Sequence, residues 1–258
     1  MKRVVLSLLL ATIIPSSIAQ NNTEQWLSLF NGEDLTNWVP KFTGYELGVN
    51  HRDTFRVEAG VLKVSYDNWP DFDGEFGHLI YDEVFSHYIL RAEYRFVGDQ
   101  VSNGPGWAFR NNGLMLHGQS PESMALNQEF PASIEVQLLG GDGSAERTTG
   151  NVCSPGTNYV RDGQLITQHC INSTSETFHG DQWVSIEVEV HGDELVRHSV
   201  NGEVVFEYFG TQLDDRDPDA QALLSAGHGI NLSEGYISLQ AESHPTEFRK
   251  IELRRIPQ

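Results

Sequence analysis

The stretch ASIEVQLLGG, residues 132–141, carries two opposite patterns on one short segment. Its aliphatic side chains alternate as the buried side of a β-strand should, which places Glu135 and Gln137 together on the other side. A carboxylate in the middle of an apolar strand costs free energy unless something binds it. The segment therefore predicts a strand with one face in a core and the other face available to a ligand.

The rest of the chain repeats short alternating runs, separated by glycines and Asn/Asp turns, without a long helical period. The expected strands cover residues 54–57, 61–66, 77–81, 88–96, 106–110, 113–117, 133–139, 164–169, 182–190, 195–200, 203–208, 235–241 and 248–254. Asn201-Gly202 suits a type I′ turn between two of these strands. No repeat or linker divides the chain, so we expect one all-β sandwich domain with little helix.

The start of the chain has the pattern of an export signal. A basic N-terminus precedes an apolar run over residues 4–14, and small residues follow at positions 17 and 19. This arrangement is typical of a signal peptide, here residues 1–19, which leaves residues 20–258 as the β-sandwich domain. No later run is apolar enough to span a bilayer. We expect a periplasmic or secreted protein.

The chain is strongly acidic, with a formal net charge of −19 at pH 7. A surface of this sign repels nucleic acids and anionic membranes, so we expect no nucleic acid partner and no membrane insertion. Two acidic loops, residues 67–75 and 213–221, have oxygen ligands that would suit a divalent cation such as calcium. Neither follows the EF-hand spacing, and charged loops are usually solvated, so the sequence assigns no certain cofactor.

The chain has two cysteines, Cys153 and Cys170. In an oxidising compartment such a pair predicts a disulfide. The segment between them resembles a hairpin with Asp162-Gly163 at its turn, so the bridge would close the base of that hairpin.

A second strand, YILRAEYRF at residues 88–96, separates its polar and apolar residues in the same way as the strand around Glu135. If both strands lie in one curved sheet, Glu93 and Arg95 converge with Glu135 and Gln137 on its concave side. Such a mixture of polar groups suits the recognition of hydroxyl groups.

Further candidates lie on neighbouring strands, namely Arg110, His117, Gln240, Glu242 and, as a ring that could stack on a sugar, Trp107. The alternative for any such face is the solvated side of an antiparallel sheet. We accept that alternative for Glu187 and Glu189. We also expect His169 to pack near the disulfide, and His228 and His244 to lie in solvated turns.

Four segments resemble one known family. LFNGEDLTNW (29–38) is similar to its opening LFNGKDLTGW, and YILRAEYRF, SIEVQLL and ISLQAESHPTEFRKIEL (237–253) are similar to its later strands, in the same order. The chain is identified as a member of the 3-keto-disaccharide hydrolase domain family, formerly domain of unknown function 1080. The insert at 117–132 and the region of the cysteines go beyond the family pattern.

The resemblance implies a concanavalin A-like jelly roll of two curved antiparallel sheets, with a sugar site on the concave sheet. It also implies an exported enzyme of polysaccharide or oligosaccharide breakdown. A related family, the retaining β-glucanases, places its carboxylates in a Glu-x-Asp-x-x-Glu strand. The matching positions here are Glu135, Gln137 and Gly140, so two of the three carboxylates are missing and that double displacement is not expected.

A 3-keto sugar needs different chemistry. Its carbonyl acidifies the proton at C2, so a base can remove that proton and expel the C1 substituent, and hydration then completes a net hydrolysis. We expect Glu135 or His117 as the base, with Arg95 and Arg110 stabilising the enolate oxygen. The substrate-binding candidates are Glu93, Gln137, Trp107, Gln240 and Glu242.

The predicted ligand is an oligosaccharide or a 3-keto-glycoside. A non-catalytic carbohydrate-binding module on the same fold is the alternative, because it needs the same polar face and aromatic rings.

Overall fold

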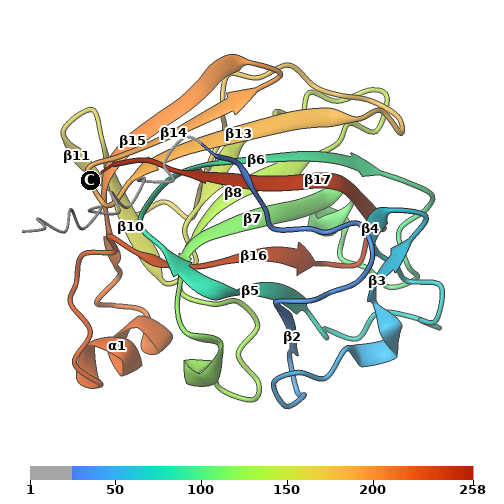
Figure 1. The fold of residues 1–258 in the computed structure, drawn as a ribbon, viewed down its shortest axis with the longest axis horizontal. Coiled ribbons are helices and arrows are strands. Elements are labelled where there is room, and N and C mark those ends of the chain that lie inside the picture. The colour runs from blue at the N-terminus through green and yellow to red at the C-terminus, as the bar shows by residue number, and fades with distance from the viewer. Residues whose placement is uncertain (1–24, 258) are drawn as a thin grey trace, which may run out of the picture.

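The computed structural model describes residues 25–257 as two antiparallel β-sheets packed face to face (Figure 1). The signal peptide predicted over residues 1–19 lies outside the described residues. The strands are β1 (Leu27–Ser28), β2 (Trp38–Phe42), β3 (Phe55–Glu58), β4 (Val61–Val64), β5 (Gly77–Phe85), β6 (His87–Phe96), β7 (Asn111–Gly118), β8 (Ile134–Leu139), β9 (Asn151–Cys153), β10 (Thr157–Arg161), β11 (Gln164–Ile166), β12 (Cys170–Ile171), β13 (Val184–His191), β14 (Leu195–Val200), β15 (Glu203–Leu213), β16 (Gly235–Ala241) and β17 (Thr246–Arg255).

The larger sheet has the strand order β11-β10-β15-β14-β13-β6-β17-β4-β3, with β1 paired to β17. The smaller sheet has the order β12-β9-β8-β7-β16-β5-β2. This arrangement confirms the predicted two-sheet sandwich. It contradicts the prediction that the strands around Glu93 and Glu135 share one sheet, because β6 lies in the larger sheet and β8 in the smaller.

The core lies between the sheets and is built from the alternating apolar residues of both. Leu114 on β7 and Val136 on β8 are fully buried in it, and so are Leu90 on β6 and Val188 on β13. Successive strand residues point to opposite faces. Glu135 therefore points away from the core, to the face of the smaller sheet that we call its outer face.

Helix is scarce in the described residues, as predicted. It consists of the short 3-10 helices η1 (His51–Asp53), η2 (Gly106–Ala108) and η3 (Pro121–Ser123) and the α-helix α1 (Pro218–Ser225). The helix α1 begins where Asp217 accepts hydrogen bonds from the backbone N–H groups of Asp219 and Ala220, at 2.9 and 3.0 Å, with Pro218 in the first turn. No helix within residues 25–257 is long and apolar enough to cross a membrane.

Both predicted hairpin turns are present. Asn201 and Gly202 join β14 to β15, and Asp162 and Gly163 join β10 to β11. All four residues have positive φ, between 48° and 89°, which is the conformation that a type I′ turn requires. The strand predicted over 106–110 is wrong, because residues 106–108 form η2.

The predicted disulfide between Cys153 and Cys170 is confirmed, with Cα atoms 4.1 Å apart. It joins β9 to β12 at the edge of the smaller sheet. The hairpin between the two cysteines, β10 and β11, belongs to the larger sheet. The bridge therefore closes a loop of chain that crosses from one sheet to the other and back.

Candidate functional site

A pocket of about 340 Å³ opens on the outer face of the smaller sheet. Its walls come from β7, β8, β9 and β12 and from the segments around η2 and before β8. The lining residues are Trp107, Asn111, Phe130, Glu135, Gln137, Cys153, Pro155, His169, Cys170 and Glu242. We call this the inner pocket.

Two carboxyl groups lie in the inner pocket. Glu135 projects from the middle of β8 and Glu242 follows the end of β16, and their exposed fractions are only 6% and 3%. Oε1 of Glu135 and Oε2 of Glu242 are buried, and neither has a hydrogen-bond partner within residues 25–257. Buried polar groups are normally paired, so these two carboxyl groups mark the inner pocket as a candidate binding site.

Burial shifts both carboxyl groups towards their neutral forms. It raises the pKa of Glu135 well above its usual value, and the nearby Glu242 charge adds to the effect. Burial also raises the pKa of Glu242, to about 8. The pair can therefore hold a proton at neutral pH, when exposed carboxyl groups have lost theirs.

Gly113 on β7 leaves the space that the Glu135 side chain fills. A Cβ atom at this position would lie 2.6 Å from both Cγ and Oε1 of Glu135, and it would also overlap Oε1 of Gln240. Gln240 is fully buried, and both atoms of its amide lack a partner in the described chain. Gln240 thus lies beside Glu135 but does not line the pocket.

Two amides form the polar side of the inner pocket. Gln137 lines the pocket, and its side-chain oxygen accepts a hydrogen bond of 3.0 Å from Asn151 Nδ2. Asn111, at the start of β7, is 2% exposed, and its Oδ1 atom has no partner in the described chain. The amides offer hydrogen bonds suited to hydroxyl groups.

Aromatic rings form the opposite side. Trp107 is 54% exposed and stacks on Phe76 with ring centroids 5.7 Å apart, and Phe76 also contacts Phe130 at 5.1 Å. A supported, exposed indole is a surface on which a sugar ring can stack. Trp69, by contrast, is buried, and its Nε1 atom donates to Thr54 Oγ1.

His169 is a pocket residue that sequence reasoning missed. We expected it only to pack near the disulfide, yet it lines the inner pocket. The structure explains its position, because Cys153 is the direct strand partner of Glu135 and the disulfide joins Cys170 to Cys153, but the sequence alone did not show that β9 pairs with β8. A residue next to Cys170 is therefore held close to Glu135. Phe130, from the 117–132 insert, was also missed.

Glu93 and Arg95 do not join this site, so the predicted convergence with Glu135 is wrong. They lie on the outer face of the larger sheet, on the opposite side of the core. Arg95 pairs with Glu247 at 2.6 Å, and Glu93 pairs with Arg249. The two strands look alike in sequence, but they belong to different layers.

His117 and Arg110 also lie away from the inner pocket. His117, near the end of β7, is buried, with Nε2 3.1 Å from the carbonyl oxygen of Gly192, and burial lowers its pKa to about 4. Arg110 donates to the carbonyl oxygen of Gly180 at 2.6 Å and to Asp181 at 3.0 Å. Neither residue lines the pocket that holds Glu135.

The two acidic loops have protein partners. Asp67 pairs with Arg56, and Asp214 pairs with Arg216. Asp217 caps α1. Residues 25–257 contain no cluster of three or more His, Cys, Asp or Glu side chains placed to hold a metal ion.

Comparison with known proteins identifies a family over nearly all of the described chain. The family described as the 3-keto-alpha-glucoside-1,2-lyase-like domain matches residues 25–254. This match confirms the resemblance read from the sequence motifs. No curated protein matches the sequence.

Many solved structures share the fold, and three of them illustrate it. Two are proposed glycosyl hydrolases from Parabacteroides distasonis, with TM-scores of 0.53 and 0.52 at 15% and 17% identity. The alignments cover 90% and 93% of this chain and 100% and 98% of the other chains. The third, from Bacillus subtilis, is a protein of unknown function with a galectin-like fold, with a TM-score of 0.52, 13% identity and coverage of 90% and 95%. These similarities confirm the jelly-roll fold.

Proposed function

The chain belongs to the 3-keto-alpha-glucoside-1,2-lyase-like domain family, and we propose that it cleaves glycosidic bonds of 3-keto glycosides by elimination followed by hydration. The observation that carries this proposal is the pair of buried carboxyl groups, Glu135 and Glu242, in a pocket walled by aromatic rings and amides. We also propose that the protein is exported and that residues 20–258 form its single domain. The disulfide is compatible with an oxidising compartment.

The proposed reaction has two stages. In the first, a carboxylate takes the proton from C2, and the C2–H electrons form a C2=C3 double bond while the C3 carbonyl becomes an enolate oxygen. The enolate then re-forms the C3 carbonyl, its electrons form a C1=C2 double bond, and the C1–O bond breaks. The leaving oxygen takes a proton from the other carboxyl group. In the second stage, the oxygen of a water molecule adds to C1 and its proton goes to the ionised carboxylate, while the protonated carboxyl group returns a proton to C2, which gives the free 3-keto sugar. The sum of the two stages is hydrolysis.

The carboxyl pair suits both proton transfers. A general base must be ionised and a general acid must be protonated at the same pH, and neighbouring carboxyl groups meet this demand when they share one proton. Because burial raises the pKa of Glu242 to about 8, the singly ionised pair becomes more abundant as the pH rises towards that value. We therefore expect kcat/KM to increase with pH between about 6 and 8.

The enolate oxygen at C3 needs a hydrogen-bond donor. No lysine or arginine lines the inner pocket in the part of the chain that the structure describes, so the arginines predicted for this role are replaced by other groups. His169 and the amides of Asn111 and Gln137 are the polar donors present. We assign the enolate oxygen to His169 and the sugar hydroxyl groups to the amides.

The decisive experiment compares a 3-keto glycoside with the same glycoside before oxidation. Release of the leaving group from the 3-keto compound alone supports elimination, because only the ketone acidifies C2. Release from both compounds indicates a conventional glycosidase. Binding of either compound without release indicates the non-catalytic carbohydrate-binding module.

The acid and the base of the pair can be told apart by the leaving group. A phenol with a low pKa departs without protonation, whereas a sugar alcohol needs the acid. We expect the variant that lacks the acid, among Glu135→Gln and Glu242→Gln, to recover activity on a nitrophenyl 3-keto glycoside. The variant that lacks the base should stay slow on both substrates.

A further inference from the structure

A second compartment, of about 580 Å³, adjoins the inner pocket. It is lined by Ala125, Asn127, Gln128, Glu129, Phe130, Ala132, Pro155, Gly156, His169, Asp217 and Asp219. Phe130, Pro155 and His169 line both spaces, so they form the boundary between them. We call this second space the outer compartment. We refer to the two adjoining spaces together as the groove, and the carboxyl pair lines the inner pocket only.

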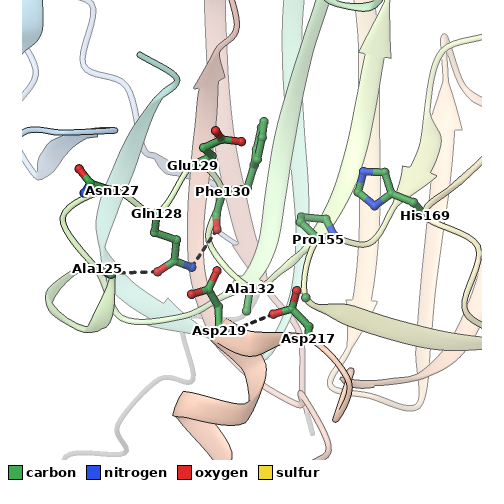
Figure 2. A pocket seen from close by; sticks show the side chains of 11 residues that line it. Ala125, Asn127, Gln128, Glu129, Phe130, Ala132, Pro155, His169, Asp217 and Asp219 are labelled. Atoms are coloured by element: carbon green, nitrogen blue, oxygen red, sulfur yellow. Dashed lines mark hydrogen bonds between the residues drawn. The ribbon is translucent and has the colours of Figure 1, made fainter. Parts of the chain in front are cut away.

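Figure 2 shows how three separate segments build the outer compartment. Asp217 and Asp219 project from the start of α1 towards the loop that carries Gln128 and Phe130, and Pro155 and His169 lie on the other side. The loop has a defined shape, because buried Gln128 donates to the Phe130 carbonyl at 2.9 Å and accepts from the Ala125 N–H at 3.1 Å. Asp217 is held by its capping bonds to α1.

We propose that the outer compartment binds the leaving group of the glycoside, and that it selects an uncharged or positively charged sugar ring over an anionic one. This inference rests on the proposed function and deepens it. The inner pocket holds the 3-keto ring beside Glu135 and Glu242. The bond that breaks then lies at the boundary formed by Phe130 and His169, and the departing ring extends towards α1.

The size of the groove supports a substrate of at least two rings. The inner pocket alone is within the usual range for a small-molecule site, and the outer compartment is larger than the inner one. A small alkyl leaving group would leave the outer compartment filled only with water. A second sugar ring would use Phe130 as an apolar contact and Asn127 as a hydrogen-bond partner.

The charges of the outer compartment set the selectivity. It has three carboxylates, Glu129, Asp217 and Asp219, whereas His169 at the boundary is its one basic side chain among the described residues. The whole chain carries a net charge of −19, which adds to their repulsion of anions. An anionic ring, such as a uronic acid, would meet like charges, which is an effective way to reject a ligand. An amino sugar would be attracted.

The test uses three 3-keto disaccharides that differ only in the leaving ring, which is glucose, glucosamine or glucuronic acid. We expect wild-type kcat/KM to be highest for the glucosamine compound and lowest for the glucuronic acid compound. Removing carboxylates in Glu129→Gln and Asp219→Asn should reduce the ratio of these two values by about fivefold for each charge, because each carboxylate attracts one ring and repels the other, and this is the combined size of two Coulomb interactions over roughly 8 Å in water. Asp217 is left intact because it caps α1.

Glu187→Gln is the matched control, because it makes the same charge change at an exposed position on β13 of the larger sheet. It should leave the ratio unchanged. High salt should compress the wild-type ratio, since screening weakens interactions of partly exposed charges. A wild-type ratio near one, or a ratio unchanged in the double variant Glu129→Gln/Asp219→Asn, would overturn the inference while leaving the proposed function intact.

If the proposed function is wrong, none of the three compounds will be cleaved. In that case, calorimetric measurement of the binding of the same three compounds tests the selectivity of the outer compartment separately. A preference for the glucosamine compound that disappears in the double variant would support the outer compartment even then. Equal binding of all three, or no binding, would overturn it.

Discussion

The outer faces of the two sheets have the same sequence pattern, but their polar side chains have different surroundings. On the larger sheet, Glu93 and Arg95 have oppositely charged partners, Arg249 and Glu247, supplied by β17. On the smaller sheet, Glu135 lies in a pocket covered by loops and the disulfide, and its buried oxygen has no partner in the described chain. In the sequence, the strands of both faces show the same alternation of polar and apolar residues.

The difference shows what strand alternation can and cannot reveal. Alternation indicates that a side chain points away from the core, but cross-strand partners and covering loops decide what it does there. Exposed ion pairs each contribute little free energy, whereas unpaired buried carboxyl groups are costly and are typical of binding and catalytic sites. Five experiments separate the two faces, with effects that decrease in size from the first to the last.

The largest effect is expected from Glu135→Gln. The substitution preserves shape but removes the group that transfers a proton, so kcat/KM on a 3-keto glycoside should fall by roughly two to four orders of magnitude. Glu93→Gln makes the same change on the other face and should alter kcat/KM by less than about threefold. Steady-state kinetics measures kcat/KM of both variants, and circular dichroism checks that both are folded. Equal activity of the two variants would contradict the prediction.

The second effect is expected from removing the disulfide that lines the inner pocket. Replacing Cys153 and Cys170 by serine removes a bridge that closes a loop of 17 residues, so the free energy of unfolding should fall by about 3 kcal/mol. The change also frees His169, which should raise KM more than the loss of stability alone would explain. Urea unfolding measures the change in the free energy of unfolding. Kinetics at temperatures at which the variant is still folded measure the change in KM. Unchanged stability would show that the loop is held by its strand pairing alone.

Much of the fold was predictable from the sequence, because long runs with a period of two and Asn-Gly turns leave few alternatives. The strand β2 was missed because Pro40 and Lys41 interrupt its apolar pattern, and β9 was missed because it has only three residues. The strand predicted over 106–110 failed because Pro105 precedes a 3-10 turn. Local pattern does not specify which strands become neighbours, so the assignment of β6 and β8 to one sheet was wrong.

The candidate site was predictable in part from the sequence. Four of the residues predicted from the sequence line the inner pocket, namely Glu135, Gln137, Trp107 and Glu242. His169, Asn111 and Phe130 come from loops and strand ends, where no periodicity marks a direction. Arg110 and His117 have positive φ values of 42° and 51° at the ends of β7, so strand alternation does not describe where their side chains point.

The third effect is a dependence of stability on pH. Glu242 has a raised pKa of about 8 in the folded protein, whereas an unfolded glutamate ionises near 4.5. Between these values the folded chain retains protons that the unfolded chain releases, so this group makes the free energy of unfolding decrease as pH rises. Glu242→Gln removes that contribution. We expect the variant to be more stable than wild type at pH 8 by roughly 2–3 kcal/mol, below the limit of 1.36 kcal/mol per pKa unit.

Urea unfolding of both proteins at pH 5, 6.5 and 8 measures this prediction. The comparison with wild type isolates Glu242 from the buried histidines His78, His117, His198 and His244, and the expectation that His244 lies in a solvated turn is wrong. Burial lowers the pKa of the first three to about 4 and that of His244 to about 3. As pH falls below about 6.5, the unfolded chain binds protons that these folded histidines do not bind, so the histidines make the free energy of unfolding decrease at low pH, whereas Glu242 makes it decrease at high pH. A stability difference that does not change with pH would mean that Glu242 is ionised in the folded protein.

The fourth effect tests how Glu135 is positioned. In Gly113→Ala the new methyl group would displace Glu135 and Gln240, so kcat/KM should fall by about tenfold to a hundredfold, as is common when a reacting group is misplaced. Gly229→Ala is the control, because a Cβ atom there meets no atom within 4 Å and its φ is not positive. Should both variants lose the same activity, the loss would reflect a general cost of replacing glycine.

The smallest effect is expected from Arg95→Lys. Arg95 pairs with Glu247 and lies over the Trp183 ring at 4.6 Å. Lysine keeps the charge but lacks the planar fork, so the free energy of unfolding should fall by less than about 1 kcal/mol. Turnover should stay at the wild-type level, because the sandwich core separates this face from the inner pocket. If turnover instead falls as far as in Glu135→Gln, the larger sheet takes part in the reaction and the contrast between the two faces fails.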